Sequence, residues 1–150
     1  MDKMQDLTLQ ASDDTLYTVL DAIEAHLDRN GCPDSIKTEI LISVEEIYVN
    51  IAHYAYEGRP GEATVQMEIT QNPGRCRVVF KDRGIPYNPL EKEDPDLQLS
   101  AEEREIGGLG IFMVKQYMDQ VEYQYKDGCN ILAIEKALPH SGDIPLSESP

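Results

Sequence analysis

The chain has 150 residues, 41% of them hydrophobic, so it can bury one sizeable core and is expected to form a single domain. Its 28 Asp and Glu residues against 13 Lys and Arg give a formal net charge of −15. Such a surface repels nucleic acid and anionic membranes, which excludes both as expected partners and favours a basic protein partner.

One strand and two helices are predicted in the N-terminal part of the chain. Residues 6–11 alternate between apolar and polar, which predicts a strand with one buried face. Polar capping residues at 12–14 precede apolar residues at helical spacing over 16–28. A second, longer helix is expected over 33–56, where the glycines and proline of 58–61 end it.

Two β-hairpins and a third helix are predicted in the rest of the chain. The first hairpin joins strands at 63–70 and 76–81, and the second joins strands at 121–125 and 130–135. Between the hairpins, residues 87–106 contain prolines and many charges, so we expect a lid over a functional site. Gly107 to Gly110 would be the hinge of this lid, and the third helix would follow at 111–118.

This order of elements predicts an α+β fold. We expect a two-layer α/β sandwich, with a mostly antiparallel sheet and three main helices on one face. The folded domain is expected over 1–138, and the Pro- and Ser-rich residues 139–150 are expected to form a disordered tail.

The cysteines and the apolar runs exclude further classes of protein. Cys32, Cys76 and Cys129 are scattered without a CxxC pair, so neither a zinc site nor a disulfide framework is expected. No apolar run approaches the roughly 20 residues of a membrane span, and the N-terminus has no signal-peptide core. We therefore expect a cytoplasmic protein.

Three short motifs indicate a nucleotide site. Glu46 and Asn50 are four residues apart in the second helix, so both side chains share one helix face. A carboxylate and an amide placed this way suit a hydroxyl or water and a hydrated metal ion. Asp82 follows a buried strand, where a carboxylate can meet a ligand. The glycines at 107–110 run into an apolar helix, which is typical of phosphate binding.

Each motif also has an explanation without a ligand. Glu46 and Asn50 could be polar residues on a solvated helix edge, and residues 82–84 could form a plain turn. The glycines at 107–110 could simply begin a helix. The three motifs together, in this order, favour the nucleotide site.

The same motifs resemble those of a known superfamily. Glu-x-x-x-Asn on a helix, Asp-x-Gly after a strand and Gly-x-Gly opening a helix are similar to the GHKL (Bergerat-fold) ATPases. Within that superfamily, the chain most resembles the stand-alone bacterial anti-sigma-factor serine kinases, also called the histidine-kinase-like ATPase group. Residues 44–56 are similar to the N-box of the group, and the resemblance covers 7–138.

The resemblance implies a role for each motif residue. Glu46 would be the general base, and Asn50 would hold Mg²⁺. Asp82 would accept a hydrogen bond from the adenine amino group, and Gly84 would let the base approach the backbone. The backbone N–H groups that face the ATP phosphates would belong to Gly107, Gly108 and Gly110.

The resemblance further implies an ATP- and Mg²⁺-dependent protein serine/threonine kinase. Its substrate would be a small STAS-type anti-anti-sigma protein; a sigma factor would be a second partner, and a homodimer is a further expectation. One departure is Pro86, where the superfamily prefers glycine, because proline stiffens the loop and lacks an N–H donor. The alternatives are a non-catalytic ATP-binding switch module and, against the intact motifs, an interaction domain whose site has lapsed.

Overall fold

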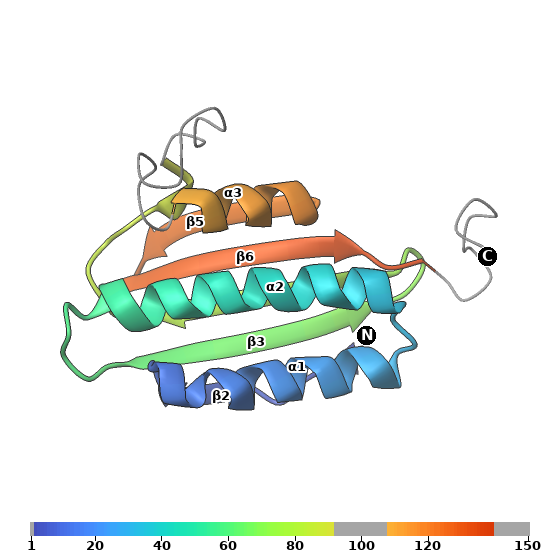
Figure 1. The fold of residues 1–150 in the computed structure, drawn as a ribbon, viewed down its shortest axis with the longest axis horizontal. Coiled ribbons are helices and arrows are strands. Elements are labelled where there is room, and N and C mark those ends of the chain that lie inside the picture. Colours follow the sequence, from blue (N-terminus) through green and yellow to red (C-terminus); the bar gives the residue numbers. More distant parts are fainter. Residues whose placement is uncertain (1, 92–107, 140–150) are drawn as a thin grey trace.

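The computed structural model describes residues 2–91 and 108–139, and its strands form one antiparallel sheet (Figure 1). The strands are β1 (Asp2–Lys3), β2 (Leu7–Gln10), β3 (Glu62–Thr70), β4 (Arg75–Asp82), β5 (Gln120–Lys126) and β6 (Cys129–Ala137). Their order is β1-β3-β4-β6-β5, with β2 also paired to β3. Both hairpins are confirmed, whereas the short strand β1 was not predicted.

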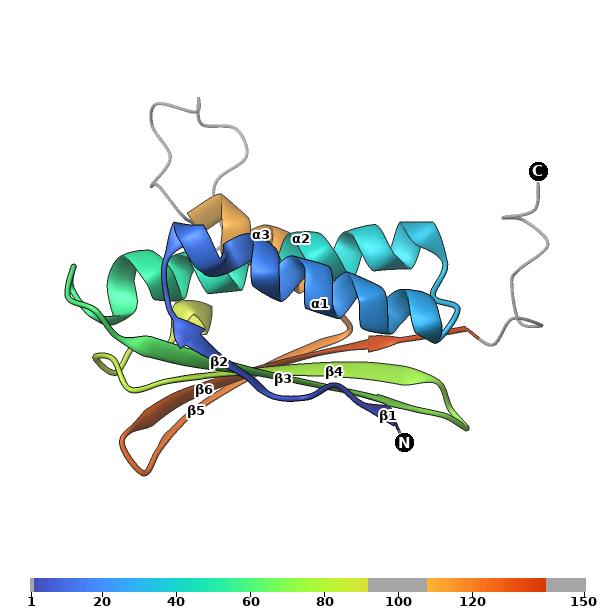
Figure 2. The same ribbon diagram turned by 90° about the horizontal axis from the view of Figure 1, so that it is seen from below.

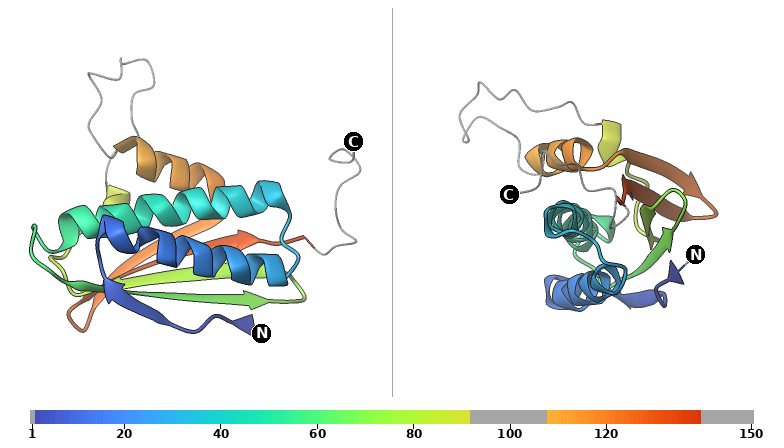
Figure 3. Two further views of the ribbon diagram at one scale, coloured as in Figure 1. Left: turned by 60° about the horizontal axis from the view of Figure 1, so that its bottom comes forward. Right: turned by 90° about the vertical axis from the view of Figure 1, so that its right-hand side faces the viewer.

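The helices lie together on one face of this sheet, as Figures 2 and 3 show. They are α1 (Leu16–Arg29), α2 (Asp34–Asn50) and α3 (Gly108–Tyr117), with short helical turns at η1 (Asp13–Thr15), η2 (Ile51–Ala55) and η3 (Pro89–Glu91). This arrangement confirms the predicted α+β two-layer sandwich with its helices on one face. Within residues 2–91 and 108–139, no helix is long and apolar enough to cross a membrane.

Two helix boundaries differ from the prediction. The second helix is α-helical to Asn50 and then continues as the wider π-helix η2, Ile51–Ala55, which the apolar periodicity could not distinguish from an α-helix. The third helix begins at Gly108 rather than at residue 111, so Gly108 and Gly110 belong to its first turn. Most of the predicted lid and all but residue 139 of the predicted tail lie outside the described residues.

Strand alternation carries a carboxylate onto the helix-covered face of the sheet. The inward side chains of β4 are Cys76, Val78, Phe80 and, as the last residue of the strand, Asp82. The β4–β6 register pairs Asp82 with Asn130, which begins the inward series of β6. Two buried polar side chains therefore stand side by side at one end of an otherwise apolar layer.

Tyr48 connects α2 to the N-terminal segment from inside the core. Its side chain is 0% exposed, and its hydroxyl group lies 2.6 Å from Thr15 Oγ1. Thr15 Oγ1 in turn donates to the carbonyl oxygen of Gln10, at 2.7 Å. This chain of hydrogen bonds ties the end of β2 and the start of α1 to the central helix.

We expect Tyr48→Phe to lower the free energy of unfolding by about 0.5–1.5 kcal/mol, the net contribution of one hydrogen bond, because the ring still fills its space. Urea unfolding followed by circular dichroism measures the change. Tyr17→Phe is the matched control, because the Tyr17 side chain is 70% exposed. Equal stability of Tyr48→Phe and the wild type would contradict the role of the hydroxyl group.

Candidate functional site

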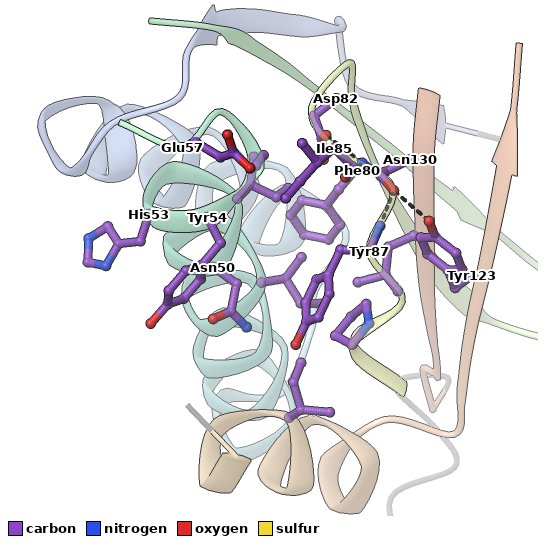
Figure 4. A pocket seen from close by; sticks show the side chains of 16 residues that line it. Asn50, His53, Tyr54, Glu57, Phe80, Asp82, Ile85, Tyr87, Tyr123 and Asn130 are labelled. Carbon is purple, nitrogen blue, oxygen red and sulfur yellow. Dashed lines mark hydrogen bonds between the residues drawn. The ribbon is translucent and has the colours of Figure 1, made fainter. Parts of the chain in front are cut away.

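A cavity of about 530 Å³ opens between α2 with η2, the start of α3 and the inward faces of β4 and β6 (Figure 4). Its lining is mainly apolar and includes Ile47, Phe80 and Leu132. Small-molecule pockets typically measure about 300–1,000 Å³ and combine such a lining with a few polar groups. Asn50, Asp82 and Asn130 supply polar groups here.

Asp82 lines the cavity, and one of its carboxylate oxygens has no partner among the described residues. The residue is 6% exposed. Its Oδ1 accepts hydrogen bonds from the Gly84 N–H and from Asn130 Nδ2, both at 2.9 Å. Among the described residues, none donates to Oδ2. Since a buried carboxylate oxygen is costly to leave unpaired, Oδ2 is the natural acceptor for a donor on a ligand.

Asn130 holds the groups around Asp82 in place, and the sequence reasoning missed it. Its Nδ2 also donates to the Ile85 carbonyl oxygen at 2.8 Å. Its Oδ1 accepts from the Tyr87 N–H at 3.1 Å and from the Tyr123 hydroxyl group at 2.5 Å. The available signal was a polar residue in the inward phase of a predicted strand, but its meaning depends on the strand register.

Gly84 has a packing role that the structure makes visible. A Cβ atom at this residue would lie 2.2 Å from the carbonyl oxygen of Ala55, in the last turn of η2. The next residue, Ile85, donates its N–H to that same oxygen at 2.9 Å. Glycine therefore lets the loop after β4 dock on the end of η2, which closes one side of the cavity.

Asn50 is the last residue of α2 and lines the cavity, as Figure 4 shows. Its side-chain amide makes no hydrogen bond to a described residue. In the described part of the chain, no group of three or more His, Cys, Asp or Glu side chains could hold a metal ion. The amide oxygen of Asn50 fits a cation such as Mg²⁺, which takes few protein ligands and completes its shell with phosphates and water.

Glu46 lies one helical turn before Asn50 and touches the start of α3. A Cβ atom on Gly110 would lie 2.2 Å from Glu46 Oε2, so the carboxylate occupies the space that a side chain would need. Burial raises the pKa of the Glu46 carboxyl group above its usual value, and the charge of Glu45 adds to the effect. The first and third sequence motifs therefore meet in space, although Glu46 is not among the residues that line the cavity.

Three further residues belong to the predicted motifs or adjoin them. Gly108 is the first residue of α3, whereas Gly107 lies outside the described residues. His53 follows Asn50 by three residues and is also among the residues that line the cavity. Its Nε2 lies 2.9 Å from Asp13 Oδ1, so it joins η2 to the turn before α1.

We expect Gly84→Ala and Gly110→Ala to have opposite consequences. The new methyl group at residue 84 meets the backbone of Ala55, so the free energy of unfolding should fall by roughly 1–3 kcal/mol, as at other overpacked sites. At residue 110 it meets the mobile end of Glu46, and alanine is favoured over glycine within a helix by about 1 kcal/mol. Gly110→Ala should therefore fold at least as stably as the wild type.

Chemical unfolding of both variants measures the difference, and each variant is the control for the other. Equal destabilisation of the two would contradict the contacts assigned to these glycines.

Comparison with protein families gives a match over most of the chain. Residues 9–136 match the family model described as the histidine kinase-like ATPase domain. Among the curated relatives, the serine/threonine-protein kinase BtrW of Bordetella bronchiseptica is 25% identical over 100 residues, which are 66% of this chain and 69% of that protein. The serine-protein kinase RsbW of Listeria monocytogenes is 29% identical over 99 residues, 63% of this chain and 62% of that one. The match therefore covers less than two thirds of that RsbW.

Solved structures share the fold. The crystal structure of the RsbU and RsbW domains of a Mycobacterium tuberculosis protein has a TM-score of 0.64 and 17% identity, covering 92% of this chain and 33% of that one. The histidine kinase domain of a blue-light activated kinase from Erythrobacter litoralis has a TM-score of 0.51 and 20% identity, covering 87% and 65%. At these identities the structural matches show a shared fold and nothing further. By its family match, the chain belongs to the histidine kinase-like ATPase domains.

Proposed function

We propose that this protein binds ATP with Mg²⁺ and transfers the γ-phosphoryl group to a serine or threonine of a protein partner. The observation that carries the proposal is the buried Asp82 carboxylate, whose Oδ2 lacks a partner among the described residues at the end of an apolar cavity. The proposal assigns the ATP-binding domain to residues 1–138.

Asp82 suits the recognition of adenine. Its free oxygen is an acceptor, and the adenine ring presents an amino group as donor, with apolar ring faces that suit the lining of the cavity. Guanine presents a carbonyl oxygen at the corresponding position, which would leave two acceptors facing one another. Mismatched buried hydrogen-bonding groups discriminate strongly between ligands.

Asn50, Gly108 and Gly110 suit the phosphates. When bound, Mg²⁺ would neutralise and bridge phosphate oxygens, with the Asn50 amide oxygen as its protein ligand. Gly108 and Gly110 lie in the first turn of α3, where backbone N–H groups have no partner within the helix and can donate to phosphate. Such local donors are needed because the chain as a whole carries a net charge of −15. The roles of Gly84 toward the base and of Gly107 toward the phosphates remain part of the proposal.

Glu46 is the proposed general base. The hydroxyl oxygen of the acceptor would attack the γ-phosphorus, the bond to the β-phosphate oxygen would break, and ADP would leave. Glu46 would accept the hydroxyl proton, and its raised pKa makes it a stronger base than an ordinary carboxylate. Its contact with Gly110 supports a place for it beside the phosphate-binding end of α3.

The kinase names of the relatives support the choice of reaction, at 25% and 29% identity. We propose a small STAS-type anti-anti-sigma protein as the substrate, a sigma factor as a second partner, a homodimer as the assembly and the cytoplasm as the location. One observation favours a non-catalytic ATP-binding switch as the second candidate: Glu46 is not among the residues that line the cavity.

The proposal is tested by measuring the transfer of labelled phosphate from ATP to candidate STAS proteins, with the wild type and with Glu46→Gln. The substitution keeps the shape of the side chain and removes the base. Phosphotransfer should fall by about 10²–10⁴-fold, the usual contribution of a positioned base, while the affinity for MgATP changes little.

Glu45→Gln is the matched control, because it is the same substitution at the adjacent, exposed residue. Near-normal transfer by Glu46→Gln would exclude the base role. If the wild type binds ATP but transfers phosphate to no candidate, the switch module is the better description.

A further inference from the structure

We propose that Asn130 is a positioning residue that sets the purine selectivity of the cavity, by orienting the Asp82 carboxylate so that one of its oxygens faces the ligand. The inference rests on the proposed ATP site and adds to it a residue on a different strand. The β4–β6 register places Asn130 opposite Asp82, and both residues line the cavity.

The chemistry around Asn130 permits one orientation of its amide. Oδ1 faces the N–H of Tyr87, which can only donate, and Nδ2 faces the carbonyl oxygen of Ile85, which can only accept. The Tyr123 hydroxyl group also meets Oδ1. Burial raises the pKa of Tyr123, so this hydroxyl keeps its proton at neutral pH and donates. Figure 4 shows Asn130 between Asp82 and Tyr123.

Asparagine is the residue type that these neighbours require. Its two N–H groups reach Asp82 and Ile85, and its one oxygen accepts from Tyr87 and Tyr123. Aspartate would offer the same shape without donors, and a serine or threonine hydroxyl group would offer one donor in place of two. At 7% exposure, water cannot easily replace a missing partner.

This arrangement restricts Asp82 to a single role. With Oδ1 already accepting from Gly84 and Asn130, the carboxylate cannot rotate without breaking both hydrogen bonds. A carboxylate oxygen can only accept, so Oδ2 is held in place as an acceptor for a ligand. Asn130 also holds the loop after β4 through Ile85 and Tyr87, and the Tyr87 side chain extends into the cavity in Figure 4.

An acceptor fixed in this way distinguishes two purines that differ at one position. Adenine has an amino group there and donates to Oδ2, whereas hypoxanthine has a carbonyl oxygen and cannot. The wild type should therefore bind ADP much more tightly than inosine diphosphate. An Asp82 carboxylate that is not held in place would lose that distinction.

Calorimetry with ADP and inosine diphosphate tests the inference in Asn130→Asp. The variant keeps the side-chain shape and removes both N–H donors, so Asp82 loses a hydrogen bond that orients it and ADP loses the aligned acceptor. The ratio of the two affinities should fall by about tenfold or more, equivalent to about 1.4 kcal/mol.

Asn88→Asp is the matched control. It adds the same charge to the loop after β4, outside the lining of the cavity, and a carboxylate can still accept from the Leu90 N–H as Asn88 Oδ1 does at 2.9 Å. Its added charge should weaken both nucleotides equally and leave the affinity ratio unchanged.

If Asn130→Asp does not fold, the same two affinities are measured in Tyr123→Phe. It removes one hydrogen bond that orients the Asn130 amide, so the affinity ratio should fall by roughly 2–10-fold. A folded variant that loses affinity for both nucleotides equally, with its ratio within about twofold of the wild type, would overturn the inference and leave a structural role. If the wild type binds neither nucleotide, the proposed function itself fails, and this inference fails with it.

Discussion

The site depends on the burial of one carboxylate. Asp82 occupies the inward series of β4 after Cys76, Val78 and Phe80, where a charge is costly unless it is hydrogen-bonded. The Gly84 N–H and the Asn130 amide provide these hydrogen bonds, and both act on the same oxygen. The fold thus stabilises the charge while leaving its other oxygen without a partner among the described residues.

The remaining parts of the site are arranged around this end of the sheet by close contacts. Gly84 lets the loop after β4 meet the backbone of Ala55, which joins that loop to η2. At the start of α3, Gly110 leaves room for the Glu46 carboxylate of α2. The contact at Gly84 needs the absence of a side chain, so this glycine helps to set the distance between η2 and the loop after β4. The loop after β4 and the start of α3 therefore both contact α2 or its continuation η2.

Much of this organisation could be predicted from local sequence patterns. Period-two alternation predicted β2 and β3, turn signals predicted both hairpins, and the motif spacing brought Glu46, Asp82 and Gly110 into consideration. Asn130 escaped prediction because its partners come from β4, β5 and the loop after β4, and they meet only through strand register. The π-helical turn after Asn50 and the start of α3 at Gly108 were also missed, because apolar periodicity does not fix hydrogen-bond geometry.

A crystal structure of the protein with ADP and Mg²⁺ would test the role of Asp82 most directly. We expect the adenine amino nitrogen to lie about 2.7–3.2 Å from Asp82 Oδ2, the range of an N–H···O hydrogen bond, with the Asn130 contacts to Oδ1 unchanged. Adenine bound away from Asp82, or seated in the cavity without a contact to this carboxylate, would contradict the assignment of Asp82 as the base-recognising residue.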